Sequence, residues 1–156
     1  MKISDFLCSE AVTADLKATS KEGAIEELVG LLVNAGVIDK KNKTKFVEVL
    51  MAREALGSTA IGQGIAIPHG KSENVSTLVA ALGISKNGID FDSLDGEPAH
   101  IFFLLLAPID SAGPHLKALA RISRLLKDKY FRENLKSVKD DKTILKLIAQ
   151  EDKRIL

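Results

Sequence analysis

A glycine-rich stretch in the first half of the chain is the segment best suited to chemistry. Residues 53–71 read REALGSTAIGQGIAIPHGK and combine four glycines with two hydroxyl side chains, a glutamine and His69. Glycine permits positive φ angles and close backbone approach, so such a loop can turn its amide N–H groups toward an anion. The composition of this stretch therefore indicates a phosphate-binding pocket.

Two nucleotide-binding motifs come close to this stretch, but neither fits. Residues 64–72 read GIAIPHGKS, one residue longer than the phosphate-binding loop of nucleotide hydrolases, and Ile65 stands where that loop needs glycine. Pro68 also removes one of the amides that such a cradle would use. The dinucleotide fingerprint fails as well, because Gly62-Gln63-Gly64 is followed by Ile67 where a third glycine belongs. We therefore predict neither a nucleotide nor any other cofactor.

His69 is the residue of this stretch whose side chain is best suited to chemistry. It follows a short apolar run and lies between Pro68, which fixes the backbone, and Gly70, which leaves one face of the imidazole open. We expect the ring to be presented outward where a strand ends. A single histidine more often has a purely structural role, however, and residue types alone favour that interpretation.

The elements that position His69 can be predicted from hydrophobic patterning. Three apolar runs are too continuous for half-exposed strands and predict interior strands over residues 65–67, 78–84 and 101–107. Asn87-Gly88 predicts a tight turn into a strand over residues 89–91, and Asp95-Gly96 predicts another turn. Weak alternation over residues 12–16 predicts an edge strand. An antiparallel hairpin should therefore lie inside a mixed sheet.

Helical periodicity predicts two helices before the glycine-rich stretch and three after the last strand. Thr19 and Glu22 form a capping box that opens the first helix, and Gly36 provides its left-handed C-terminal cap. The second helix starts after Asp39 and ends near Arg53. The other three begin with Pro114 in a first turn and continue over residues 130–135 and 142–150. The chain should form a single three-layer α/β domain over residues 1–156, a mixed β-sheet flanked by helices.

Composition excludes several function classes. The 156 residues carry 22 Lys plus Arg against 21 Asp plus Glu, so the net charge of +1 points to neither nucleic acid nor an anionic membrane. The single cysteine, Cys8, excludes an intramolecular disulfide and suits a reducing cytoplasm. The longest apolar run, residues 101–107, is far shorter than the roughly 20 residues of a membrane-spanning helix. We expect a cytoplasmic protein without membrane insertion.

Two separated motifs in this chain resemble the enzyme IIA domains of the fructose and mannitol class (type 2) of the bacterial phosphoenolpyruvate-dependent sugar phosphotransferase system, including their nitrogen-regulatory relatives. The first motif comprises Glu54, Ile61, Gly62 and residues 65–70, IAIPHG; the second is residues 110–126, DSAGPHLKALARISRLL, with His115 at a helix start. The likeness extends over nearly the whole chain, including GIDFDSLDGEP at residues 88–98. It implies one enzyme IIA domain over residues 1–156.

The resemblance implies that His69 accepts a phosphoryl group from the histidine-containing phosphocarrier protein and passes it to a cysteine of a fructose-class enzyme IIB. The chemistry is reasonable, because an imidazole with a pKa of about 6.5 is largely an unprotonated nucleophile at neutral pH and also a good leaving group. We expect the other ring nitrogen of His69 to donate to a backbone carbonyl, which would fix the tautomer that leaves the attacking nitrogen bare.

The resemblance also assigns the supporting residues. His115 would donate a ring N–H to the phosphoryl oxygens, Arg53 would neutralise them, and Ser58 and Thr59 would offer hydroxyl or amide donors. Structural alternatives exist for each: His115 could cap its helix, Arg53 could pair with Glu54 or Glu48, and the two hydroxyls could stabilise the loop. We assign Glu54 to structure or to the rim of the pocket, and His100 to packing.

Two further expectations concern the loop and its rim. Ala60 stands where many members of the family have glycine, which puts the local loop conformation in doubt, because alanine resists positive φ. The rim of the pocket should be a modest apolar patch for transient docking of partners, with Ile61 and Ile65 as contributors.

Two other functions remain open at this level. Single-domain relatives act in nitrogen and potassium control, where phosphorylation of the same histidine changes the choice of regulatory protein targets. A metal-dependent hydrolase using His69, His115 and Asp110 is the remaining alternative, but it needs more ligands at fixed spacing than the chain offers. We predict no metal.

Overall fold

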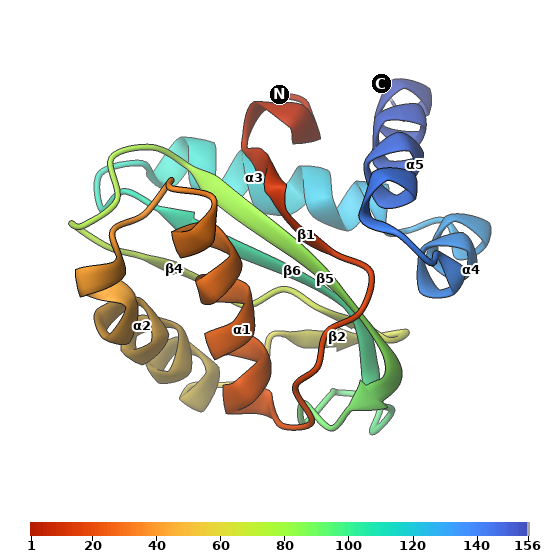
Figure 1. The fold of residues 1–156 in the computed structure, drawn as a ribbon, viewed down its shortest axis with the longest axis horizontal. Helices are drawn as coiled ribbons and strands as arrows, with labels where there is room; N and C mark the ends of the chain where they lie inside the picture. The colour runs from red at the N-terminus through yellow and green to blue at the C-terminus, as the bar shows by residue number, and fades with distance from the viewer. Residues whose placement is uncertain (156) are drawn as a thin grey trace.

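The computed structural model describes residues 1–155, which form a mixed sheet between two layers of helices (Figure 1). The strands are β1 (Leu7–Thr13), β2 (Ala60–Gly62), β3 (Ile65–Ala66), β4 (His69–Lys71), β5 (Val79–Ile89) and β6 (Ala99–Ala107). Their order is β1-β5-β6-β3-β2, and β4 also pairs with β6. The sheet is mixed because β5 and β6 are antiparallel, whereas β1 is parallel to β5 and both β3 and β4 are parallel to β6.

Helices cover both faces of this sheet (Figure 1). One face carries α1 (Lys21–Asn34) and α2 (Lys43–Ala55), and the other carries α3 (Ala112–Leu125), α4 (Lys129–Ser137) and α5 (Asp141–Arg154). Short 3₁₀ turns at Ile3–Asp5 and Lys40–Asn42 precede β1 and α2. The predicted three-layer α/β fold is confirmed.

Strand β6 is the centre of the core. Its side chains point alternately to the two helical layers: Phe103 and Leu105 pack with α3, α4 and α5, whereas Phe102 and Leu104 pack with α1 and α2. All four are fully buried. A strand buried on both faces has no polar face, which is why residues 101–107 form one continuous apolar run.

The path beside β6 is interrupted, and this interruption sets the position of His69. β3 ends at Ala66, the chain leaves regular pairing at Ile67 and Pro68, and β4 then resumes with His69 opposite Leu105. His69 therefore begins a strand rather than ending one, which corrects the expectation from sequence. Pro68 cannot donate to the strand ladder, but its carbonyl accepts from the amide of Leu105 at 2.9 Å.

Three local predictions were wrong in detail. The edge strand is β1, which lies earlier than residues 12–16. The side-chain cap of α1 is Ser20, whose Oγ accepts from the Gly23 amide, rather than Thr19. Asn87-Gly88 is not a hairpin turn: β5 continues through it with a register shift, Gly88 has φ of +81°, and the hairpin with β6 closes later in the chain.

Candidate active site: the His69–His115 pair

The backbone of its own chain fixes His69 in one tautomer. Nδ1 of the imidazole lies 2.7 Å from the carbonyl oxygen of Ile67. A carbonyl can only accept, so the neutral ring carries its hydrogen on Nδ1 and leaves Nε2 unprotonated. The side chain is only partly buried, so this nitrogen can meet a partner. The geometry matches the expected carbonyl contact and produces an oriented nucleophile.

His115 lies opposite His69, on the first turns of α3. The two ring centroids are 5.5 Å apart and the planes meet at 61°, an edge-to-face arrangement. His115 is 6% exposed, and its Nδ1 is buried without a hydrogen-bond partner among residues 1–155. The backbone amide of His115 already donates to Ser111. Its ring therefore does not cap the helix, and its hydrogen-bonding capacity is left for another group.

Both imidazoles are kept neutral. Burial lowers the pKa of His69, and the Arg53 cation acts in the same direction, against the opposing effect of the Ile67 carbonyl. Burial lowers the pKa of His115 to about 4, with help from the neighbouring charges of protonated His69 and Lys71. At neutral pH, the site therefore presents one unprotonated nucleophile beside a second neutral imidazole.

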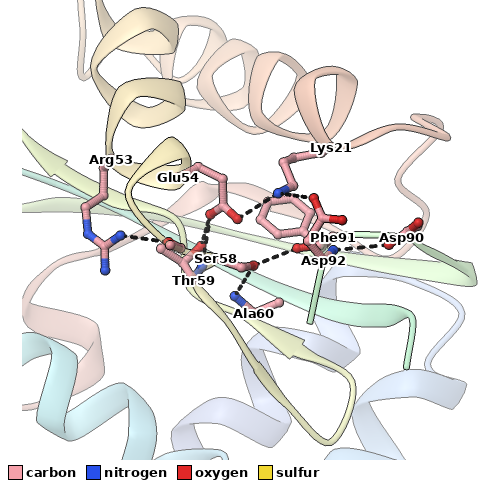
Figure 2. A network of polar contacts seen from close by, with 10 residues as sticks. Lys21, Arg53, Glu54, Ser58, Thr59, Ala60, Asp90, Phe91 and Asp92 are labelled. Atoms are coloured by element: carbon pink, nitrogen blue, oxygen red, sulfur yellow. Dashed lines mark hydrogen bonds and ion pairs between the residues drawn. The ribbon is translucent and has the colours of Figure 1, made fainter. Parts of the chain in front are cut away.

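Arg53 lies on the last turn of α2, and its side chain turns toward the loop that follows (Figure 2). Its Nη1 donates to the carbonyl oxygen of Gly57 at 2.9 Å. Neither Glu54 nor Glu48 forms an ion pair with it in the described part of the chain. Its charge is therefore not cancelled locally, and it is close enough to lower the pKa of His69.

Ser58 and Thr59 already donate their hydroxyl hydrogens to groups within the protein. Ser58 Oγ donates to the Phe91 carbonyl at 2.6 Å and accepts from the Ala60 amide at 3.0 Å. Thr59 is buried and donates both its amide, at 3.0 Å, and its hydroxyl, at 2.6 Å, to Glu54. These hydroxyls therefore stabilise the loop, and a phosphoryl-binding role stays a prediction that would rest on the backbone amide of Ser58.

Sequence reasoning undervalued Glu54 and missed Lys21. The carboxylate of Glu54 is buried and accepts from Thr59 on one oxygen and from Lys21 Nζ, at 2.9 Å, on the other (Figure 2). Lys21 is the first residue of α1, where the helix dipole disfavours a cation. That misplaced charge was the available signal that Lys21 serves a partner outside its own helix.

The glycines have different roles from those expected. Gly62 and Gly64, with φ of +102° and +77°, form the turn between β2 and β3 together with Gln63. The backbone amide of Gln63 donates to the carboxylate of Asp95. Strand β3 meets β6 at Ile101 and His69 meets it at Leu105, so this turn lies about 13 Å or more along the strand from the nucleophile. It does not cradle a phosphate at His69.

Gly70 has a packing role that the sequence did not reveal, and Ala60 differs from expectation. A Cβ on Gly70 would lie 2.8 Å from Val49 Cγ1, so glycine at this position lets β4 approach α2. Ala60 lies in β2, and Gln63 and Asp92 are the non-glycine residues with positive φ among residues 1–155. Alanine therefore causes no backbone strain in the loop.

Exposed apolar side chains adjoin the site residues. Leu116 follows His115 directly and Leu56 follows the last turn of α2, and both are largely exposed. Ile61 is half exposed, but it lies in β2 beside the turn at residues 62–64, away from His69. Ile65 is 2% exposed and belongs to the core, which corrects its expected place on the rim. Isolated exposed leucines are ordinary, but exposed leucines that adjoin His115 and Arg53 in the chain would suit transient docking.

The described residues offer neither a site for a metal ion nor a helix that could span a membrane. Residues 1–155 contain no group of three or more His, Cys, Asp and Glu side chains arranged to hold a metal ion. Over the same residues, no helix combines the length and the apolarity that crossing a bilayer requires. A metal-dependent hydrolase built on His69, His115 and Asp110 would need such a metal-binding group.

Comparison with known proteins gives consistent matches over nearly the whole chain. The family described as "Phosphoenolpyruvate-dependent sugar phosphotransferase system, EIIA 2" matches residues 5–151. A nitrogen regulatory protein of Bradyrhizobium diazoefficiens is 40% identical over 96% of this chain and 95% of its own length. The fructose-specific EIIABC component of the Bacillus subtilis phosphotransferase system is 38% identical over 98% of this chain, which spans 24% of that longer protein.

A solved structure also matches this chain over nearly its whole length. The nitrogen regulatory protein IIA-Ntr of Neisseria meningitidis superposes with a TM-score of 0.83 and is 31% identical, covering 94% of this chain and 98% of the solved one. The match includes the mixed sheet and both helical layers, because so little of either chain lies outside it.

Proposed function

Because this chain belongs to the EIIA 2 family of the phosphoenolpyruvate-dependent sugar phosphotransferase system, we propose that it is a phosphohistidine carrier with His69 as its phosphoryl acceptor. Members of this family are phosphoryl-transfer components. The observation that carries the proposal is the contact between His69 Nδ1 and the Ile67 carbonyl, which leaves Nε2 unprotonated beside a second histidine. The second histidine distinguishes His69 from His100, whose Nδ1 contacts the Ser85 carbonyl in the same way.

The proposed reaction exchanges one phosphorus bond for another at each step. Nε2 of His69 attacks the phosphorus of the phosphohistidine of the histidine-containing phosphocarrier protein, so that a new P–N bond forms as the donor's P–N bond breaks. A cysteine thiolate of an enzyme IIB then attacks the same phosphorus, forming a P–S bond and returning Nε2 its electron pair. The hydrogen on Nδ1 stays in place throughout.

The residues around His69 supply charge and position for this transfer. The Arg53 cation neutralises the phosphoryl oxygens, and His115, whose ring has unused hydrogen-bonding capacity, donates an N–H to them. Both are held by helices, so little reorganisation is needed when the phosphoryl group arrives. Leu56 and Leu116 are exposed and lie close in the chain to Arg53 and His115, and they contribute to the surface on which phosphoryl donor and acceptor dock in turn.

The experiment mixes the protein with phosphoenolpyruvate, enzyme I and the phosphocarrier protein, then follows intact mass. We expect one added phosphoryl group that is labile in acid and stable in base, as a phosphoramidate is, and none on the His69→Ala variant. Incorporation into His69→Ala at the wild-type level would refute the assignment of His69. Adding a fructose-class enzyme IIB to the phosphorylated protein should return its mass to the original value.

A regulatory role is the second candidate, and a specific observation favours it. The nitrogen regulatory protein of Bradyrhizobium diazoefficiens is 40% identical to this chain, against 38% for the fructose-specific protein of Bacillus subtilis, and the nitrogen regulatory protein IIA-Ntr of Neisseria meningitidis superposes on it with a TM-score of 0.83. Capture of partner proteins from the source cytoplasm, where we place this protein, should separate the roles. Partners that bind only one phosphorylation state would support regulation, and rapid loss of the phosphoryl group to an enzyme IIB would support sugar transport.

A further inference from the structure

A continuous series of hydrogen bonds connects the buried carboxylate of Glu54 to the imidazole of His69. Thr59 donates its amide and its hydroxyl to Glu54 Oε1, at 3.0 and 2.6 Å. The carbonyl of Thr59 accepts from the amide of Ile67 at 3.0 Å. The carbonyl of Ile67 accepts from Nδ1 of His69 at 2.7 Å. The backbone position that fixes the tautomer of His69 is therefore itself fixed by Thr59 and Glu54.

Lys21 keeps this carboxylate in place. Its Nζ lies 2.9 Å from Glu54 Oε2 and 2.8 Å from Asp92 Oδ2, and 5.1 Å from the centre of the Phe91 ring (Figure 2). The Glu54 side chain is 2% exposed, so an ionised form without these partners would be strongly disfavoured. Burial alone would raise the pKa of Glu54, but the hydrogen bonds from Thr59, Lys21 and Ser58 outweigh it and hold the pKa below its ordinary value.

The same network also restricts the orientation of the Arg53 side chain. Arg53 precedes Glu54 on α2, and its Nη1 donates to Gly57, two residues before Thr59. The loop between them is further fixed where Ser58 donates to Phe91. Glu54 thus anchors one loop that determines both the direction of the Arg53 guanidinium and, through Ile67, the orientation of the nucleophile.

We propose that Glu54, held by Lys21, is a positioning residue for phosphoryl transfer, acting on His69 through Thr59 and Ile67 and on Arg53 through the loop at residues 57–59. This inference rests on the proposed function for its kinetic consequence. Its structural consequence, the tautomer of His69, does not depend on that function. Glu54 itself contacts neither the nucleophile nor any reacting atom.

The test compares Glu54→Gln, Lys21→Met and Lys21→Arg with a matched control. Glutamine still offers Thr59 an acceptor but loses the charge that Lys21 binds, and arginine keeps the charge that methionine removes. The control is Arg121→Met, which breaks another buried ion pair, the Arg121–Asp152 pair at 2.5 Å in the opposite helical layer. Two readouts are taken: the imidazole ¹⁵N shifts of His69, which report its tautomer, and the kinetics of transfer from the phosphocarrier protein.

We expect Glu54→Gln and Lys21→Met to move the ¹⁵N shifts away from the pure Nδ1–H tautomer and to lower kcat for transfer by about 10- to 100-fold, with KM nearly unchanged. Lys21→Arg should retain most of the wild-type rate. Arg121→Met should lower stability without changing the shifts of His69. If Glu54→Gln and Lys21→Met lose stability as Arg121→Met does, but keep the wild-type tautomer of His69 and the wild-type kcat, the proposal is overturned.

The two failures can be told apart. If the wild-type protein takes up no phosphoryl group, the proposed function fails, yet the ¹⁵N shifts still decide whether Glu54 orients His69. If Glu54→Gln does not fold, the comparison of Lys21→Met with Lys21→Arg decides the question, because both leave every contact between Glu54 and Thr59 available.

Discussion

The buried Nδ1 of His115 has no hydrogen-bond partner in the described structure, although the ring lies 5.5 Å, centroid to centroid, from that of His69. Leaving a buried polar atom unpaired costs about 1–3 kcal/mol, and folded proteins tolerate this cost chiefly where function requires it. Desolvation keeps the ring neutral in the free protein. A phosphoryl group on His69 would bring negative oxygens toward this ring and favour its protonated form.

His115→Ala should therefore fold and still carry His69, but exchange phosphoryl groups slowly in both directions. Removing one donor to developing charge in an enzyme site typically costs about 10²- to 10³-fold, and we expect a loss of this order in the transfer rate constant measured by rapid quench. His100→Ala is the matched control, because His100 is a partly buried histidine whose Nδ1 contacts the Ser85 carbonyl. Equal rates in wild type and His115→Ala would remove the assigned role.

The stability of the unphosphorylated protein should fall as the pH falls from about 6.5 to about 4. The unfolded chain binds a proton at His115 with a pKa near 6.5, whereas the folded protein binds it only near pH 4, so acid favours unfolding across this window. The contribution is fully present above pH 6.5 and amounts to about 3 kcal/mol. Urea unfolding of wild type and His115→Gln at pH 4.5 and 7.5 measures it, and the variant should show the smaller pH dependence. A pH dependence as steep in His115→Gln as in wild type would contradict the low pKa.

Arg53 should matter through both its charge and its forked shape. Arg53→Gln removes the cation that lowers the pKa of His69, so the pKa of His69 should rise and transfer should slow by about 10²-fold. Arg53→Lys keeps the charge but not the planar geometry that can bind Gly57 and a phosphoryl oxygen together, so its rate should lie between the two. NMR titration of His69 and kcat/KM for transfer are the two measurements. A wild-type rate in Arg53→Gln would show that the guanidinium does not bind the phosphoryl group.

Elements with one dominant periodicity were predictable from the sequence. Strand β6 is apolar at every position from Ile101 to Ala107 because both faces are buried, and α3 follows a helical repeat after Pro114. The break between β3 and β4 was not predicted. Pro68 marks the end of the apolar run, but residues 69–71 read HGK and contain no apolar residue, so no pattern indicates that pairing with β6 resumes at His69.

The family resemblance singled out the two histidines, since residue types alone favoured a structural role, but it did not indicate the network that supports them. Lys21 and Glu54 lie 33 positions apart, and only the packing of α1 against α2 brings them together. No local pattern encodes that contact. The hydroxyls of Ser58 and Thr59 illustrate the same limit, since their residue type suits a phosphate but their partners are Phe91 and Glu54.

Gly70 offers a test of how closely β4 must approach α2. A Cβ at this position would lie 2.8 Å from Val49 Cγ1, closer than real Cβ contacts allow, so Gly70→Ala must displace Val49 or the strand that begins with His69. We expect a loss of about 1–3 kcal/mol in the free energy of unfolding. If the clash with Val49 is the cause, the double variant Val49→Ala, Gly70→Ala should lose less than the sum of the two single variants.

Gly113→Ala is the control, because no atom lies within 4 Å of a Cβ there and the position is helical, so alanine should be neutral or stabilising by up to about 1 kcal/mol. Additive losses in the double variant would mean that the strand itself, not the Val49 side chain, absorbs the added methyl group, and the ¹⁵N shifts of His69 should then change.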